Sequence, residues 1–263
     1  MYQILEKKML NHQIGFMKIH APYIGKNAHP GQFVMLRVDE DGERIPLTYF
    51  DFDDDSVSII YQVVGLSTHK LNRLNVGDYI ADIAGPLGKS TDLSHYKNAI
   101  VIGGGVGCAI AHPVSKTLYQ QGSFVTTILG FRSKPYIFLN DSFQDVSSKH
   151  YITTDDGSFG IKGKVTDVLE KLLENNTYDL IYAVGPLIMM KYVTKMAKSK
   201  NIKTIVSMNP IMIDGTGMCG GCRLSIGKKT FFACVDGPDF DAYDVDFDEI
   251  IKRNQQYQSI EKQ

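Results

Sequence analysis

The sequence predicts an N-terminal antiparallel β-barrel, an α/β domain built on a parallel sheet, and a small segment at the C-terminal end. Up to residue 97, short candidate strands are separated by turns rich in Gly, Pro and Asp, at the spacing typical of barrels and sandwiches. From residue 98, buried-strand patterns alternate with helical ones, as in a right-handed parallel sheet. From residue 209, Gly and Asp leave few residues for a core. We therefore expect domains at 1–97, 98–208 and 209–263.

The barrel region contains several candidate strands and no pattern that predicts a long helix. Turn signals such as His29-Pro30-Gly31 and Val76-Gly77-Asp78 separate the strands. The expected strands are Tyr2–Lys7, Ile14–His20, Gln32–Val38, Ser56–Gln62 and Tyr79–Ile83.

The α/β region begins with the apolar run Ala99–Ile102, which suits a strand buried on both faces. A glycine-rich turn and a helical pattern up to Gln121 follow. Further buried strands are expected at Phe124–Leu129, Tyr151–Thr154, Leu180–Val184 and Thr204–Met208, with helices at Lys164–Leu173 and Leu187–Lys200.

Composition limits the partners that this chain of 263 residues can have. A formal net charge of −1 argues against nucleic acid or an acidic membrane as the main partner. No run of 18 apolar residues occurs, and the N-terminus lacks the pattern of a signal peptide. Three of the four cysteines stand at ligand spacing, which fits a reducing compartment better than a disulfide scaffold. We expect a cytoplasmic protein.

The most specific motif is D-G-T-G-M-C-G-G-C at 214–222, followed by Cys234. With Asp214 included, the spacing is D-x4-C-x2-C-x11-C, which is the plant-type [2Fe–2S] ferredoxin spacing with an aspartate at the first position. The glycines of the motif allow the backbone to wrap closely around a cluster. We expect a [2Fe–2S] cluster, with structural zinc as a second interpretation and free cysteines as a third. The expected ligands are Asp214, Cys219, Cys222 and Cys234.

A second motif, G-G-G-V-G at 103–107, follows a strand and precedes a helix. Backbone N–H groups in such a turn can bind a pyrophosphate, assisted by the helix dipole. The motif is not G-x-G-x-x-G, and Gly130-Phe131-Arg132 replaces the acid that binds the ribose in Rossmann domains. A tight packing turn between strand and helix is the plainer interpretation. Cys108, at the start of the helix, is assigned no role.

Two segments of the barrel region suggest anion binding. Arg44-Ile45-Pro46-Leu47-Thr48 combines an arginine with a proline-stiffened segment, so that the arginine can pair with a phosphate while the backbone and Thr48 face a flavin ring. Gly65-Leu66-Ser67-Thr68 offers hydroxyls and a glycine at a helix start. An exposed arginine at a strand end is the plainer interpretation of the first segment.

Together these motifs resemble the ferredoxin–NADP reductase superfamily, and within it one branch. That branch includes the electron-transfer subunit of two-subunit dihydroorotate dehydrogenase and the small subunit of NADH-dependent reduced ferredoxin:NADP oxidoreductase, also described as a sulfide dehydrogenase subunit. The aspartate at the first ligand position resembles the second type, because the dihydroorotate-linked subunits typically carry four cysteines. The other matching motifs are P-G-Q-F-V (30–34), R-I-P-L-T (44–48), G-L-S-T (65–68), G-P-L-G (85–88), G-G-G-V-G (103–107), T-D-D-G-S-F-G (154–160) and V-G-P-L-I-M-M (184–190).

The resemblance implies an FAD-binding barrel, a domain that binds NAD(H) or NADP(H), and a cluster-binding segment. FAD would contact Arg44, Pro46, Leu47, Thr48, Ile60, Tyr61, Gln62, Gly65, Ser67 and Thr68. The nicotinamide nucleotide would contact Gly104, Gly105, Val106 and Gly107, with Asp155, Gly185 and Met189 nearby.

The implied function is that of an electron-transfer flavoprotein subunit. The nucleotide and FAD would exchange a hydride, and single electrons would pass through the cluster to or from a larger partner with FAD and two [4Fe–4S] clusters, and through it to ferredoxin. No catalytic side chain is expected on this chain. The alternatives are the electron-transfer subunit of dihydroorotate dehydrogenase and, outside enzymes, a flavin- and zinc-binding interaction module. The choice between NAD and NADP remains open.

Overall fold

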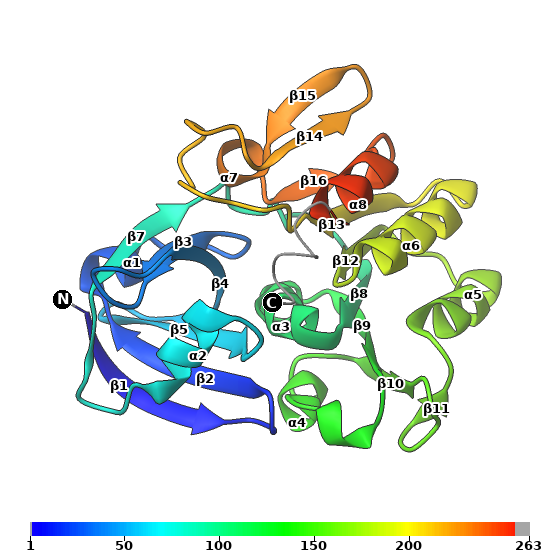
Figure 1. Cartoon of the computed structure of the whole chain (residues 1–263). Coiled ribbons are helices and arrows are strands. Elements are labelled where there is room, and N and C mark those ends of the chain that lie inside the picture. Colours follow the sequence, from blue (N-terminus) through cyan, green and yellow to red (C-terminus); the bar gives the residue numbers. More distant parts are fainter. Residues whose placement is uncertain (1, 256–263) are drawn as a thin grey trace. The chain divides into compact units, whose positions relative to one another are not determined.

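The computed structural model describes residues 2–255 and divides the chain into two compact units (Figure 1). The barrel unit contains the described residues of 1–91, 209–238 and 245–263, and the sheet unit contains 92–208 and 239–244. The segment expected at 209–263 therefore contributes to both units, and its last eight positions lie outside the described residues.

The barrel unit is built on a seven-stranded antiparallel sheet of order β6-β1-β2-β5-β4-β3-β7. Its edge strands β6 and β7 are consecutive in the chain and separated only by Ala81. One nearly continuous stretch thus pairs with β1 on one side and with β3 on the other, which closes the sheet. The strands are β1 (Tyr2–Met9), β2 (Ile14–His20), β3 (Phe33–Arg37), β4 (Arg44–Phe52), β5 (Ser56–Gln62), β6 (Tyr79–Ile80) and β7 (Asp82–Leu87).

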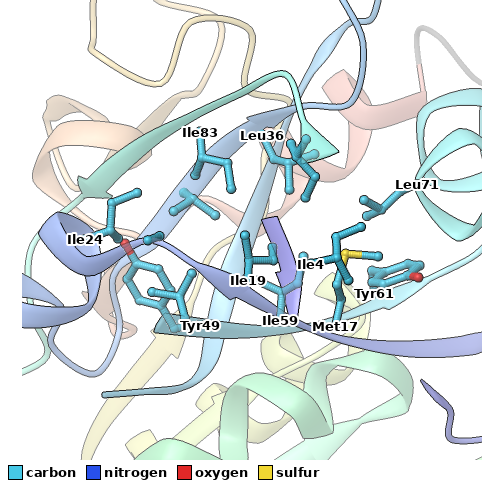
Figure 2. Close-up of a cluster of buried hydrophobic side chains, with 14 of the residues drawn as sticks. Ile4, Met17, Ile19, Ile24, Leu36, Tyr49, Ile59, Tyr61, Leu71 and Ile83 are labelled. Carbon is cyan, nitrogen blue, oxygen red and sulfur yellow. The ribbon is translucent and has the colours of Figure 1, made fainter. Parts of the chain in front are cut away.

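Alternation along these strands decides which side chains fill the barrel. In β5, for example, Val57, Ile59 and Tyr61 lie in the core, while the residues between them face outward. Figure 2 shows this core, which includes Leu71 of helix α2 (Leu66–Arg73); Ile24 of helix α1 (Pro22–Asn27) also belongs to it.

The predicted antiparallel barrel is confirmed, and two of its strands, β2 and β5, have the predicted bounds. The strand expected at Tyr79–Ile83 is divided at Ala81 into β6 and β7. Strand β4 was expected only as an extended segment around Pro46, because Arg44 and Pro46 near its start obscure the alternation.

The sheet unit has the order β11-β10-β9-β8-β12-β13-β16, in which every pair is parallel except β13 with the edge strand β16. The predicted α/β parallel sheet is confirmed, whereas the antiparallel edge was not anticipated. Its strands are β8 (Asn98–Gly104), β9 (Phe124–Phe131), β10 (Lys149–Thr154), β11 (Ile161–Lys162), β12 (Leu180–Val184), β13 (Lys203–Ser207) and β16 (Asp239–Asp241). Its helices are η1 (Gly105–Gly107), α3 (Cys108–Gln120), η2 (Lys134–Tyr136), α4 (Asn140–Gln144), α5 (Val165–Asn175) and α6 (Leu187–Ser199).

The strand order places a reversal point beside β8. From β8 the chain adds β9, β10 and β11 on one side, then crosses to β12 and β13 on the other. In open α/β sheets, ligands bind at the carboxyl ends of the strands at such a reversal. The carboxyl ends of β8 and β12 are therefore the expected binding edge.

The C-terminal segment folds around a hairpin of β14 (Arg223–Ile226) and β15 (Lys229–Phe232), followed by α7 (Ala233–Asp236), β16 and α8 (Phe247–Gln255) (Figure 1). Its acidic stretch at 235–249 alone resembles a solvated tail. Three aromatic or aliphatic side chains within it are nevertheless buried, those of Phe240, Val245 and Phe247. Across residues 2–255, no helix is long and apolar enough to span a membrane.

Candidate cofactor sites

Two of the predicted flavin contacts on β4, Pro46 and Thr48, lie on the outer face of the barrel. Met35 pairs with Pro46 and Phe33 with Thr48, and paired residues share a face of the sheet. Val34 belongs to the core, so its neighbours Phe33 and Met35 face outward, and with them Pro46 and Thr48. Pro46 and Thr48 are half-buried, so these two positions could hold a flat ring against the outside of the barrel.

The same alternation turns two predicted flavin contacts inward. Leu47 packs against the barrel core, and Tyr61 lies within it, with its hydroxyl 3.2 Å from Asn72 Oδ1. Only the backbone of either residue can contact a group on the outer face. Ile60 and Gln62, which alternate with Tyr61, face the outside.

Arg44 has a protein partner that sequence reasoning missed. Its Nη2 atom lies 2.5 Å from Asp82 Oδ2, and both side chains are about one third exposed, at 38% and 33%. The pairing follows from the fold, because Arg44 begins β4, Asp82 begins β7, and both strands flank β3. A phosphate at this position would have to share the guanidinium with Asp82 or displace it.

The N-terminus of α2 presents a second anion-binding edge. Gly65 is the N-cap in extended conformation, and the first turn contains no acidic residue. Thr68 is occupied as a cap, because its Oγ1 accepts hydrogen bonds from the N–H groups of Val64 and Gly65 at 3.0 Å each. The N–H groups of the first turn have no intrahelical acceptor, so those of Leu66 and Ser67 suit an anion better than the Thr68 hydroxyl does.

The glycine-rich turn serves packing at two positions and offers open space at a third. A Cβ on Gly104 would lie 2.7 Å from Met189 Sδ, and a Cβ on Gly107 would lie 2.7 Å from the Val184 carbonyl oxygen. Gly105 has a φ of +55°, and its Cβ would meet nothing within 4 Å. The turn is thus a packing turn at Gly104 and Gly107, and a cradle open to a ligand at Gly105.

The other predicted nucleotide residues are distributed along the same edge. Gly185 has a φ of +151°, and a Cβ on it would lie 2.9 Å from Met189 Cε and 3.0 Å from Gly104 Cα. These three residues therefore lie in contact at the ends of β8 and β12. Val106 is exposed within the turn. Asp155 follows β10, and its N–H donates to Phe131 O at 3.1 Å, which places it two strands away from β8.

Cys108 faces the interior of the sheet unit. It is fully buried, and burial raises the pKa of its thiol well above the usual range. A protonated, enclosed thiol has no access to a ligand, in line with its lack of an assigned role.

Two predicted cluster ligands are brought together by the hairpin. Cys222 precedes β14 and Cys234 follows β15, and their Sγ atoms lie 3.2 Å apart in a buried position. Burial, followed by the neighbouring Cys222, raises the pKa of the Cys234 thiol to about 12. Two thiolates on one tetrahedral metal lie about 3.7 Å apart for metal–sulfur bonds of about 2.3 Å, so a small adjustment would let both bind one iron.

Asp214 and Cys219 form the second pair. The Cys219 N–H donates to Asp214 Oδ2 at 2.8 Å, and the Thr216 N–H donates to Asp214 Oδ1 at 3.0 Å. The bond from Thr216, more than that from Cys219, holds the pKa of the Asp214 carboxyl below its usual range. Cys219 is exposed, and its Sγ accepts the Gly221 N–H at 3.3 Å. The carboxylate thus caps the turn, and this capping is the plainer interpretation of Asp214 beside that of a cluster ligand.

The four predicted ligands therefore form two pairs rather than one closed set. Within residues 2–255, no three His, Cys, Asp or Glu side chains converge on a single ion position. A [2Fe–2S] cluster takes two protein ligands at each of its two irons, so the paired arrangement fits it.

Comparison with known proteins places this arrangement in context. Residues 209–246 match the family described as the iron-sulfur cluster binding domain of dihydroorotate dehydrogenase B. A Thermotoga maritima protein named as a homologue of the dihydroorotate dehydrogenase B (NAD(+)) electron transfer subunit is 44% identical, over 99% of this chain and 93% of its own length. The electron transfer subunit of that enzyme from Fusobacterium nucleatum is 34% identical, over 88% of this chain and 92% of its own length.

Solved structures agree on the fold. A chain from the structure of NADH-dependent reduced ferredoxin-NADP oxidoreductase, solved in work on flavin-based electron bifurcation, has a TM-score of 0.94 and 43% identity, covering all of this chain and 95% of its own. An Amycolatopsis cytochrome P450 reductase has a TM-score of 0.65 at 17% identity, covering 76% of this chain and 66% of its own, and shares the fold alone.

Proposed function

Because the chain belongs to the family of the electron-transfer subunits of dihydroorotate dehydrogenase B, we propose that it moves electrons between a nicotinamide nucleotide and a larger partner subunit by way of FAD and a [2Fe–2S] cluster. Membership confirms the predicted resemblance, cofactor set and electron-transfer role. Within the family, we assign it to the ferredoxin:NADP oxidoreductase type. The observation that carries this assignment is Asp214, which takes the first ligand position and pairs with Cys219.

FAD supplies the conversion between the paired electrons of a nicotinamide nucleotide and the single electrons of an iron–sulfur cluster. The chain's own residues bind the FAD and orient its ring. Arg44 neutralises the FAD pyrophosphate, and the outward faces of Pro46 and Thr48 support the ring. The first-turn N–H groups of α2 supply further donors for the anion.

The nucleotide is assigned to the edge at the ends of β8 and β12. The open face of Gly105 and the N–H groups that follow it suit the pyrophosphate. Gly185 and Met189 border the same edge and limit the depth to which a ligand can enter. Asp155 lies further along, beyond the end of β9.

A partner subunit would dock on the loop that contains the ligands. Met218, next to Cys219, is 89% exposed, and Ile213, next to Asp214, is 62% exposed. Val235, next to Cys234, is also exposed. Apolar side chains exposed beside a redox centre support a protein contact that keeps water away from it. We assign this rim to a larger subunit with FAD and [4Fe–4S] clusters, through which ferredoxin would exchange electrons.

Anaerobic purification of the chain tests the proposal. We expect one FAD and about two irons and two sulfides per chain, a brown colour, and bleaching by NADH or NADPH. A colourless or plain yellow protein that contains zinc would instead support the interaction module. Co-purification from the native host then identifies the partner. If the recovered complex oxidised dihydroorotate, the chain would be the dihydroorotate-linked subunit, and the assignment from Asp214 would be wrong.

A further inference from the structure

Strand β3 is buried on both faces, as is most of β5. Phe33, Val34, Met35 and Leu36 are each at most 2% exposed. Val34 and Leu36 fill the barrel, so Phe33 and Met35 must be covered from outside. Antiparallel sheets of this kind usually leave one face to solvent. The outer face of β3 is therefore covered by another part of the chain.

The cover is the cluster-binding segment, which belongs to the same unit. Gly215, directly after Asp214, is so close to β3 that a Cβ would lie 2.4 Å from Met35 Cγ, 3.1 Å from Met35 Sδ and 3.2 Å from Leu87 Cδ1. Its φ of +77° also favours glycine. No side chain fits between the ligand loop and Met35.

A second contact fixes the other end of the segment. A Cβ on Gly88 would lie 2.7 Å from Gly237 O and 3.0 Å from Phe33 Cε1. The Lys89 N–H donates to Gly237 O at 2.7 Å, and Lys89 Nζ lies 3.6 Å from Asp236 Oδ1. Gly215 and Gly237 bracket the ligands from Cys219 to Cys234, so both ends of the ligand set rest on the edge formed by β3 and β7.

The face that the segment covers is the face assigned to the flavin. Met35 lies opposite Pro46, and opposed side chains in such a pair have Cβ atoms about 4.5–5.5 Å apart. Strand β4 lies next to β3 at a spacing of about 4.8 Å, and β7 lies on the other side of β3. Met35 therefore contacts the ligand loop at Gly215 and faces the proposed flavin strand at Pro46.

We propose that the contact between Met35 and Gly215 sets the distance between the cluster and the flavin. Met35 is a positioning residue, and Gly215 allows the loop to rest directly on it. This inference rests on the proposed function, which places FAD on β4 and the cluster at Asp214. Electron transfer through protein falls off steeply with separation, so a loop lifted from Met35 would slow the step between the two cofactors.

The test compares two glycines of the barrel unit that both have a positive φ. Gly215→Ala introduces a side chain that also collides with Met35, whereas Gly77→Ala introduces backbone strain at a φ of +94° outside the ligand loop, where its Cβ would meet nothing within 4 Å. A double variant, Gly215→Ala with Met35→Ala, removes the colliding atoms. The full chain is purified anaerobically in each case.

Gly215→Ala should retain FAD and be reduced by the nucleotide at the wild-type rate. Electrons should reach its cluster about tenfold more slowly or worse, the scale on which small misplacements of reacting groups act. Its reduced-state paramagnetic resonance spectrum should change, and a protease should cleave the loop at 209–222 faster. Gly77→Ala should resemble the wild type, and the double variant should recover the spectrum and the protease resistance.

The inference is overturned if Gly215→Ala and Gly77→Ala behave alike, or if the double variant recovers neither signature. Either result would leave the proposed function intact, provided that the wild type contains FAD, iron and sulfide. A wild type that lacks iron and sulfide would contradict the proposed function itself.

Discussion

Cys222 Sγ lies 3.2 Å from Cys234 Sγ because a hairpin returns the chain to its starting point. Arg223 pairs with Phe232 at the open end of that hairpin, and the Ala233 N–H donates to Cys222 O at 3.1 Å. The spacing of eleven residues between the two cysteines is therefore the length of β14, β15 and their turn, together with Ala233. The hairpin brings one predicted ligand pair together, and the turn capped by Asp214 contains the other predicted pair.

Cys222→Ala should abolish the cluster, since it removes half of the buried pair and leaves Cys234 alone. Cys108→Ala is the matched control, because Cys108 is equally buried but lies in the sheet unit. Iron and sulfide content after anaerobic purification decides the matter. A Cys222→Ala protein with full iron content would show that the predicted ligand set is wrong.

Arg44→Ala should lower FAD affinity by about ten- to a hundredfold, because a hydrogen bond between charged groups contributes about 1.5–3 kcal/mol and about 1.4 kcal/mol is a factor of ten. Asp82→Asn should raise the affinity, since it removes the carboxylate that competes for the same guanidinium. Flavin retention in gel filtration measures both.

Lys18→Ala provides the control for Arg44→Ala. Lys18 also belongs to an ion pair on the barrel, 2.8 Å from Asp53, but lies on β2 rather than β4. Equal flavin loss in the two variants would mean that Arg44 acts through barrel stability and not through the phosphate.

Gly105→Ala should raise the Michaelis constant for the nicotinamide nucleotide while FAD and cluster absorbance remain, because its side chain would enter the open cradle. Gly107→Ala should instead destabilise the sheet unit, since its Cβ would collide with Val184 O at 2.7 Å. Thermal unfolding separates the two effects. If Gly105→Ala lost both cofactors, the turn would be structural throughout.

How far the sequence predicts this molecule depends on whether a feature is local. Neighbouring residues determine the bounds of β2 and β5, and also the spacing of the predicted ligands from Asp214 to Cys222. Strand β16 has only three residues, two of them acidic, and exists because it pairs with β13. No local pattern announces such a strand.

The same distinction holds within the sites. The ion pair of Arg44 with Asp82 joins residues on two strands that flank a third, so it becomes visible only with the register. The inward orientation of Leu47 and Tyr61 likewise depends on which face of each strand meets the core. The cover on β3 does have a local signal, because the unbroken apolar run at 33–36 indicates a strand covered on both faces.

His150 should make folding stability fall as the pH drops below about 6.5, the usual pKa of histidine. Burial lowers the pKa of His150 in the folded chain, where its Nδ1 lies 2.7 Å from Thr127 Oγ1 and its ring stacks on Phe143. The unfolded chain therefore binds the proton first, so the stability that neutral His150 contributes is present above that pH and is lost below it. His150→Gln should make the loss shallower, whereas His20→Gln, at an exposed position, should not. Unfolding in denaturant between pH 7 and pH 5 measures the difference, and parallel curves for all three proteins would contradict it.

Asp214 decides which type of subunit this chain is, and three substitutions separate its two possible roles. As a ligand it would be a harder, less covalent donor than a thiolate, so Asp214→Cys should keep the cluster but shift its reduction potential and its reduced-state paramagnetic resonance spectrum. Asp214→Asn keeps an oxygen that can cap the Thr216 N–H but loses the negative charge, and Asp214→Ala loses both. If Asp214 binds iron, the Asn and Ala variants should both contain a labile, oxygen-sensitive cluster. If it only caps the turn and another group is the fourth ligand, Asp214→Asn should match the wild type in spectrum and midpoint potential, and so should Asp214→Cys, because the fourth ligand position is already filled. That second outcome would remove the main reason for preferring the ferredoxin:NADP oxidoreductase type over its dihydroorotate-linked relative.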